Sequence, residues 1–308
     1  MAENLYRRAT VLTVLAAWLV RTSLSIYAPS TPNEPPAYCT VFNHMVKSGG
    51  TTIKTQLEDS SVAEGDQFPG LCTYGGAFDT PESCQHAVYN ASVITGYGEL
   101  LRHPLTHLGR SCEYFTVMRH PISRLVSAFY FCPDDQPLDR PQKWCGNYPM
   151  EEFTITERLL DFAKSTIWTR VAFAEMFFGL RCPPGFALCD PSVKPIAYLK
   201  GIRSVAGRDA LFRMQENLRS YRAVGIFEHW DLSMDLFDAT VTSSVRSWNK
   251  GMTLNSGPAN PERQEVLNWA YMNPEIHSAM AADILLYQYS LSLFKRQTRE
   301  VLGKVWDA

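Results

Sequence analysis

Short apolar runs alternate with segments of helical spacing along most of the chain. Four runs rich in β-branched and aromatic residues predict strands, over residues 38–42, 91–96, 113–118 and 221–227. Because strands alternate with helical segments, we expect an α/β fold with a central parallel sheet. Helices should cover both faces of that sheet, giving three layers, α/β/α.

Helical segments are recognised by apolar residues that recur every three or four positions. One follows the first strand, with Ile53 and Leu57 on one side. Another begins at Pro121, a residue that suits the first position of a helix. The remaining predicted elements are helices within residues 150–180, 193–218 and 274–302 and loops over residues 60–87 and 132–149.

The first residues depart from this pattern. Arg7 and Arg8 precede an apolar run from Ala9 to Val20, as in the n- and h-regions of a signal sequence. The run is shorter than the roughly 20 residues of a membrane span. Residues 1–27 are therefore interpreted as a cleaved signal peptide or a short signal-anchor, with an N-terminal core helix as the alternative.

Composition bounds the rest of the chain. Of the 308 residues 45% are hydrophobic, which is enough for a large core. Residues 28–37, rich in proline, are predicted to form a stalk before one folded domain at residues 38–308. The net charge of −2 lacks the strongly basic balance typical of nucleic-acid binding. No nucleic-acid partner is therefore expected, and any anionic ligand must be held by a local site.

Eight cysteines, an even number, together with the sequon at Asn90, indicate a secretory compartment. Six of them fall in close pairs within loop-like sequence: Cys72/Cys84, Cys132/Cys145 and Cys182/Cys189. Cys39 and Cys112 remain, each at the start of a predicted strand. If those strands are parallel neighbours the two thiols could meet, and buried free thiols are the alternative. No Cys-x-x-Cys occurs, so a zinc site is not indicated.

The first predicted strand ends in a polar loop that leads into a helix and reads His44-Met-Val-Lys47-Ser48-Gly49-Gly50-Thr51-Thr52. Amide groups, hydroxyls and the positive end of a helix together hold phosphate or sulfate. In the ATP-binding version of such a loop the lysine follows the glycines, whereas Lys47 precedes them. No Asp-rich strand suited to magnesium is evident either. The order favours a 5′-phosphosulfate over ATP, with an ordinary Gly-Gly turn as the alternative.

A second polar motif follows the predicted strand at residues 113–118. Arg119 stands at the carboxyl end of this strand, where open α/β sheets bind ligands. A guanidinium there can grip a phosphate with two parallel hydrogen bonds, and Ser127 on the following helix can add a hydroxyl. The alternative is an ordinary salt-bridged arginine with a serine on the helix surface.

Together the two motifs resemble the sulfotransferase superfamily. They are most similar to its membrane-bound branch, which includes the heparan sulfate 2-O- and 6-O-sulfotransferases. The first loop of that branch reads much like His-x-Pro-Lys-[Thr/Ser]-Gly/Ala-Gly/Ser-Thr. Its second motif reads like Arg-Asp-Pro-x-x-Arg-x-x-Ser-x-[Phe/Tyr], which this chain matches at Arg119, Pro121, Arg124, Ser127 and Phe129.

Two later stretches extend the resemblance over roughly residues 39–297. Val224-Gly-Ile-Phe-Glu228 is similar to the Val-Gly-x-x-Glu segment of the same branch. Its closing Asn…Asp-x-x-Leu-Tyr-x-Tyr helix is matched at Asn273, Asp283, Leu286, Tyr287 and Tyr289. The resemblance implies the P-loop-NTPase-like sulfotransferase fold, with 3′-phosphoadenosine 5′-phosphosulfate (PAPS) as co-substrate and no required metal.

The resemblance also implies roles for individual residues. Lys47 would stabilise charge on the departing phosphate, and Ser48 to Thr52 would hold the 5′-phosphosulfate. Arg119 and Ser127 would hold the 3′-phosphate. The acceptor would be a hydroxyl of a glycan or polysaccharide. The chain would be a single-pass type II protein of the Golgi membrane with a luminal catalytic domain, or else a secreted one.

The acceptor base is where the sequence departs from this pattern. The 2-O-type relatives carry a histidine after a glycine at the place of Tyr97, and a neutral tyrosine, with a reference pKa of about 10, is a poor base. Glu99 is therefore the first candidate for the base, followed by His103 and then His107. The alternatives are a helix N-terminal carboxylate for Glu99 and surface residues for the histidines.

Two other functions stay open. The first is a glycan- or nucleotide-binding protein that kept the fold and lost catalysis, which Tyr97 favours. The second is a secretory P-loop kinase, which the position of Lys47 and the presence of Arg119 and Ser127 disfavour. Donor binding without transfer would indicate the first, and magnesium-dependent ATP turnover would indicate the second.

Overall fold

A computed structural model of the chain describes nine segments: residues 38–45, 47–63, 72–74, 93–96, 111–130, 153–165, 205–241, 248–251 and 261–304. All of them fall within one compact unit, Pro36–Ala308. The predicted signal segment and stalk lie outside the described residues. Among the described helices, none is long and apolar enough to cross a membrane.

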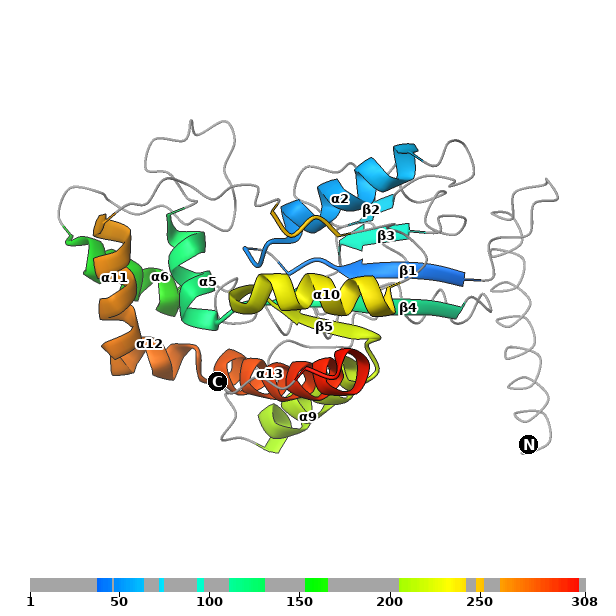
Figure 1. The fold of residues 1–308 in the computed structure, drawn as a ribbon. Coiled ribbons are helices and arrows are strands. Elements are labelled where there is room, and N and C mark those ends of the chain that lie inside the picture. Colours follow the sequence, from blue (N-terminus) through cyan, green and yellow to red (C-terminus); the bar gives the residue numbers. More distant parts are fainter. Residues whose placement is uncertain are drawn as a thin grey trace, which may run out of the picture. The chain divides into compact units, whose positions relative to one another are not determined.

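The centre of the described structure is a parallel sheet of five strands in the order β2-β3-β1-β4-β5 (Figure 1). The strands are β1 (Tyr38–Asn43), β2 (Cys72–Tyr74), β3 (Val93–Gly96), β4 (Ser111–Met118) and β5 (Ala223–Ile226). Residues 39–43 of β1, residues 114–118 of β4 and all four residues of β5 are buried, as expected for a parallel sheet shielded from water. The predicted α/β class with a parallel sheet is confirmed.

Helices follow three of the strands, β1, β4 and β5. They are α2 (Gly50–Ala63), α5 (Pro121–Phe129), α6 (Ile155–Ser165), α9 (Val205–Arg219), α10 (Trp230–Thr240), α11 (Pro261–Met272), α12 (Pro274–Ala279) and α13 (Ala281–Leu302), with a 3₁₀ turn η1 (Phe227–His229) before α10. Both α10 and α13 pack on β5 (Figure 1).

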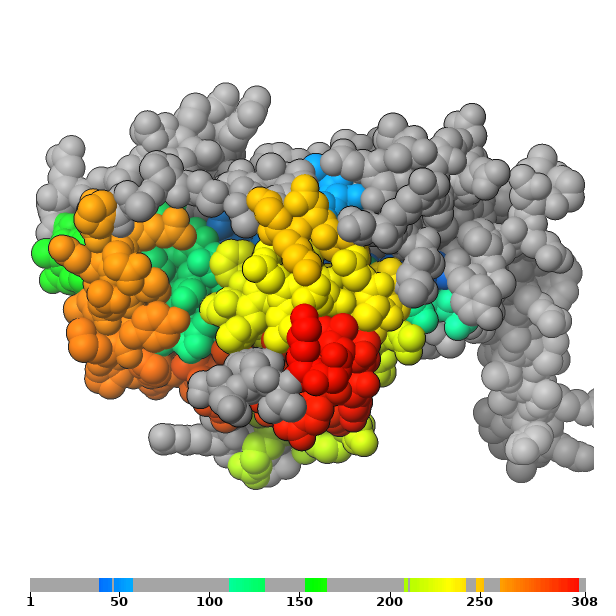
Figure 2. Space-filling view, viewed as in Figure 1, coloured from blue at the N-terminus to red at the C-terminus, as the bar shows by residue number. Residues whose placement is uncertain are grey.

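The main core forms where aromatic side chains of the sheet meet α10. The rings of Phe42 and Phe115, on neighbouring strands, lie 5.0 Å apart. Phe115 also meets Phe237 of α10 at 5.2 Å and Trp248 at 5.8 Å. Figure 2 shows α10 and residues 248–251 side by side on one face of the molecule. The core therefore fixes the sheet's central strands, whose ends carry the two polar motifs.

A second apolar cluster joins α5, α6, α11 and α12. Phe129 and Phe162 meet within it at 5.7 Å. At its border Arg124 of α5 and Asp283 of α13 form an ion pair with 3.5 Å between nitrogen and oxygen, and both side chains are only 1% exposed. Two residues quoted for separate family motifs thus meet as a buried structural pair.

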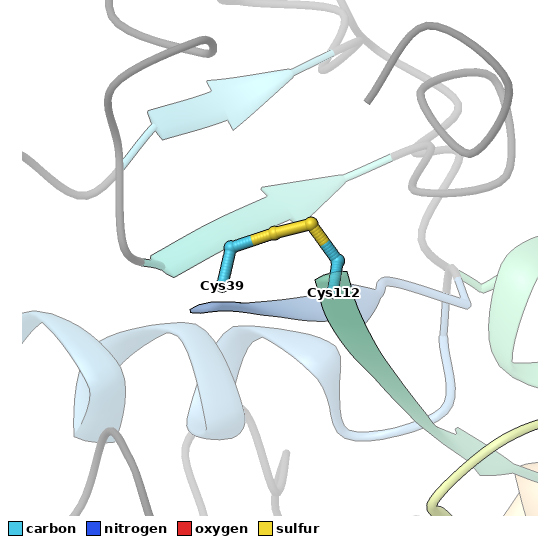
Figure 3. The surroundings of a disulfide bond; sticks show 2 residues. All are labelled: Cys39 and Cys112. Atoms are coloured by element: carbon cyan, nitrogen blue, oxygen red, sulfur yellow. A yellow bond between two sulfur atoms is a disulfide. The ribbon is translucent and has the colours of Figure 1, made fainter. Parts of the chain in front are cut away.

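Cys39 and Cys112 stand opposite each other in the β1–β4 ladder. Their Cα atoms are 4.4 Å apart and a disulfide joins them (Figure 3). The two strands are parallel neighbours, so the condition on which the pairing depended is met. Each of the other three predicted pairs has at least one cysteine outside the described residues.

Several predicted boundaries were wrong. Residues 60–87 were expected to form a loop, yet α2 continues to Ala63 and β2 lies at Cys72–Tyr74. A strand of that length is too short for any alternation to be visible. The single helix expected from Pro274 to Leu302 is divided at Met280, where φ is −100° and ψ is 8°. Helices α10 and α11 were not predicted.

Candidate anion-binding site

The site lies between β1 and β4, where the connections that leave the two strands run to opposite sides of the sheet. After β1 the chain crosses to β2, beyond β3, whereas after β4 and its helices it crosses to β5 on the opposite side. Ligands of open α/β sheets bind at such a switch point, outside the carboxyl ends of the strands. Asn43 and Thr116 are paired near the ends of β1 and β4. The loop that follows β1 and the residue that follows β4, Arg119, are therefore neighbours.

The β1–α2 loop turns tightly because two of its residues adopt left-handed backbone conformations. Lys47 has φ of 63° and Gly49 has φ of 82°. A Cβ at Gly49 would lie 2.7 Å from the Trp230 ring, and one at Gly50 would overlap the His44 ring. Gly49 is thus required both by its backbone angle and by close approach, and Gly50 by close approach alone. The helix α2 starts at Gly50, so its amino-terminal amide groups belong to this loop.

His44 packs under the loop rather than toward a ligand. Its ring stacks on Phe42 with 5.7 Å between centroids and covers Gly50. Burial, with a smaller contribution from the charge of Lys54, lowers the pKa of His44 to about 4. The imidazole is therefore neutral at physiological pH and adds no charge to the site.

The hydroxyl residues of the loop differ in their surroundings. Ser48 is fully buried, and its Oγ finds no hydrogen-bond partner within the segments that the structure describes. Thr52 is buried as well, whereas Thr51 is exposed. A buried hydroxyl that lacks a partner is costly. The Ser48 hydroxyl at this loop therefore suits a bound oxyanion such as phosphate or sulfate.

Arg119 connects the two motifs. Its Nη1 donates a hydrogen bond of 3.0 Å to the carbonyl oxygen of Lys47. Its guanidinium lies 4.4 Å from the centroid of the Phe227 ring, a cation–π arrangement. The Phe227 ring also borders Gly49. The guanidinium is thus packed between the anion loop and the turn after β5.

Three positively charged side chains, Lys47, Arg119 and Arg263, lie close enough at this loop to interact electrostatically. Burial, followed by the charges of Arg119 and Arg263, lowers the pKa of Lys47 to about 8. Burial also lowers the pKa of Arg119 to about 10, and the Glu228 carboxylate opposes that shift. Like charges held together out of water favour a multiply charged anion. No cluster of three or more metal-ligating side chains occurs among the described residues.

His120, which replaces the acidic residue of the family motif, has a structural role. Its Nδ1 accepts a hydrogen bond of 3.3 Å from the amide of Ile122 and caps α5. Its own amide donates to Glu228 Oε1 at 2.9 Å. The ring lies between Tyr271 and Tyr287. The departure from the motif therefore leaves the helix cap intact.

The structure locates the predicted donor residues as follows. Lys47, Ser48, Gly49, Gly50, Thr51 and Thr52 form the loop, and Arg119 joins it. Ser127 lies on α5 and is 8% exposed, so it is not the surface serine of the alternative interpretation. The candidate bases Glu99, His103 and His107 lie outside the described residues, as does Tyr97.

Three residues near the site were not singled out by the sequence. Phe227 lies inside a quoted family segment, but nothing in the sequence shows that its ring would contact Arg119. Trp230 touches the loop at Gly49, and its buried Nε1 has no hydrogen-bond partner in the described segments. Arg263 acts on Lys47 from α11, a helix that was not predicted. Only the tertiary structure brings these three side chains to the loop.

No protein-family model and no curated protein matches the chain. A glycine-rich turn with a buried hydroxyl and a helix amino terminus, flanked by Lys47 and Arg119, is suited to a phosphate- or sulfate-bearing ligand.

Proposed function

We propose that the chain is a PAPS-dependent sulfotransferase that transfers a sulfuryl group to a hydroxyl of a glycan or polysaccharide. Its sheet and helices would then be the three-layer, P-loop-like fold of that superfamily. The observation that carries the proposal is the hydrogen bond of 3.0 Å from Arg119 to the Lys47 carbonyl. This bond holds the guanidinium of Arg119 beside the β1–α2 loop. PAPS carries two separate anionic groups, the 5′-phosphosulfate for the loop and the 3′-phosphate for Arg119.

The loop supplies what the 5′-phosphosulfate end requires. Ser48 and the amides at the start of α2 bind the phosphosulfate oxygens, and Ser48 Oγ thereby gains the partner that its burial demands. The Lys47 ammonium lies over the bridging oxygen. It stabilises the negative charge that develops when the bond between this oxygen and sulfur breaks.

Arg119 and Ser127 bind the 3′-phosphate, the group that distinguishes this donor from ATP. A guanidinium packed on an aromatic ring is held in one plane, which favours bidentate contact with phosphate. Arg263 adds positive charge from α11. The excess of cations over carboxylates at this place fits a donor that brings several negative charges.

The transfer step is a displacement at sulfur. The acceptor hydroxyl oxygen forms a bond to sulfur, the bond to the bridging oxygen breaks, and 3′-phosphoadenosine 5′-phosphate (PAP) leaves. The hydroxyl proton passes to a base, for which Glu99 and then His103 stay the candidates. Alignment and charge stabilisation account for most of the rate enhancement, as in phosphoryl transfer. The reaction would take place in the Golgi lumen, where an N-terminal anchor would hold the enzyme at the membrane.

Calorimetric titration of the purified protein with PAP tests the proposal. We expect tight binding, weakened at least about tenfold by Arg119→Ala, because a charge-assisted hydrogen bond contributes about 1.5–3 kcal/mol. Arg219→Ala, which removes an exposed arginine of α9, is the control and should bind PAP as the wild type does. Folded wild-type protein that binds no PAP would refute the proposal.

Two further assays separate the alternatives. A protein that binds PAP but transfers no label from PAPS to any of a panel of glycans would be the non-catalytic binding protein. Magnesium-dependent ATP turnover would instead indicate a kinase. Transfer of labelled sulfate to a glycan, lost in Lys47→Ala, is the result expected of the sulfotransferase.

A further inference from the structure

The turn after β5 continues the alignment of β4 with β5 beyond the last ladder pair. Met118 pairs with Ile226 at the end of the two strands. The next residues, Arg119 and Phe227, are joined by the cation–π contact of 4.4 Å. The residues after those are joined by a hydrogen bond of 2.9 Å from the His120 amide to Glu228 Oε1. Side chains thus hold the two chain segments in register at the point where Arg119 enters the site.

Glu228 is itself held from behind. Its second oxygen, Oε2, accepts a hydrogen bond of 3.0 Å from the hydroxyl of Tyr287 on α13. Tyr287 is 7% exposed, and its ring packs edge-on against His120 at 5.2 Å. Burial, together with the Glu228 carboxylate, raises the pKa of Tyr287, so the hydroxyl remains a donor. Both carboxylate oxygens of Glu228 are therefore engaged.

The charge of Glu228 also acts on Arg119. Burial lowers the pKa of Arg119, and the Glu228 carboxylate raises it. The carboxylate attracts the Arg119 guanidinium and accepts a hydrogen bond from the amide of the next residue, His120. Because both of its oxygens accept hydrogen bonds from the protein, Glu228 is poorly suited to take a proton from an acceptor hydroxyl.

We infer that Glu228, held by Tyr287, is the positioning residue that fixes Arg119 against the 3′-phosphate of the donor. The inference rests on the proposed function. It assigns to Glu228 a role in donor recognition and not in acceptor activation, and it links α13 to the affinity for donor. The hydroxyl of Tyr287 then influences donor binding indirectly, because it holds Glu228, and Glu228 in turn positions Arg119.

The test compares two ligands that differ by the 3′-phosphate, PAP and adenosine 5′-monophosphate (AMP), by calorimetry on the full chain. Glu228→Ala should weaken PAP binding about tenfold and leave AMP binding unchanged, since charged hydrogen bonds of this kind contribute about that factor. Tyr287→Phe removes one hydrogen bond, and we expect it to lower the PAP-to-AMP affinity ratio about threefold. The control is Glu216→Ala, which removes a glutamate that is 49% exposed and should keep the wild-type ratio.

An unchanged ratio in folded Glu228→Ala would overturn the inference. So would full PAP affinity combined with a collapse of kcat, because that pattern defines an acceptor base. If the alanine variant does not fold, Glu228→Gln decides. Glutamine keeps an acceptor oxygen for the His120 amide but loses the charge, so the ratio should fall severalfold, and a wild-type ratio would refute the role. Wild-type protein that binds PAP no better than AMP would instead refute the proposed function itself.

Discussion

The buried ion pair between Arg124 and Asp283 gives the sharpest stability prediction. Replacing Arg124 with methionine keeps most of the side-chain volume but removes the guanidinium. The Asp283 carboxylate, 1% exposed, then loses the positive charge that lies 3.5 Å away. Breaking a buried pair from one side costs about 3–5 kcal/mol, because a charge that has lost its ion-pair partner stays in the interior. For a domain of this size that loss corresponds to a fall in Tm of about 10 °C.

The complementary change should be far less costly. A double variant, Arg124→Met with Asp283→Leu, removes both charges, and replacing a buried pair by apolar groups is often neutral or stabilising. We therefore expect its free energy of unfolding to lie well above that of either single variant. The exposed pair Lys164–Glu275, with side chains 46% and 57% exposed, is the matched control. Lys164→Ala should cost less than about 1 kcal/mol.

Urea unfolding followed by circular dichroism measures all four variants on the same scale. The double-mutant cycle then isolates the coupling between the two charges. A loss below about 1 kcal/mol for Arg124→Met would refute the argument, since it would mean that the carboxylate is not held at a buried, charged position. So would a double variant as unstable as the sum of the two single ones.

Three further predictions concern the loop and the sheet. PAP affinity should fall about tenfold as the pH rises from about 7 to about 9, because Lys47, with a pKa of about 8, loses most of its charge across that range; Lys47→Arg should abolish the dependence. In thermal unfolding, Gly50→Ala should cost about 1–3 kcal/mol, since its Cβ overlaps a buried ring. Gly251→Ala, which meets one atom at 3.6 Å, should change stability by less than about 0.5 kcal/mol. Joint replacement of Cys39 and Cys112 by alanine should lower the free energy of unfolding by about 4 kcal/mol in urea titration, given a separation of 73 residues.

The contacts also bring together stretches of the sequence that lie far apart in the chain. Arg124 pairs with Asp283, and Glu228 bonds to Tyr287, so residues from three separate motifs meet behind Arg119. These side chains bond to one another, and the charges of Glu228 and Arg124 act on Arg119. Such contacts join residues from separate motifs, which is why they could not be assigned from the sequence.

Local sequence was enough to predict three of the strands. The runs that became β1, β4 and β5 are apolar and rich in β-branched or aromatic residues, and such segments are buried in a parallel sheet whatever their order. The break at Met280 and the helix α11 were missed because neither has a strong local signal. They form because neighbouring elements offer apolar surface to Ile276 and Ala270, which are fully buried.

The sequence by itself determined that a glycine-rich loop with Lys47 and an arginine motif at Arg119 would each follow a strand. Strand order made these two motifs neighbours, because β1 and β4 pair in the sheet although β2 and β3 lie between them in the chain. Tertiary packing alone placed Phe227 under the guanidinium and Glu228 between the His120 amide and the Tyr287 hydroxyl. Such contacts join residues far apart in the chain, and no local pattern of hydrophobic and polar positions records which side chains will meet.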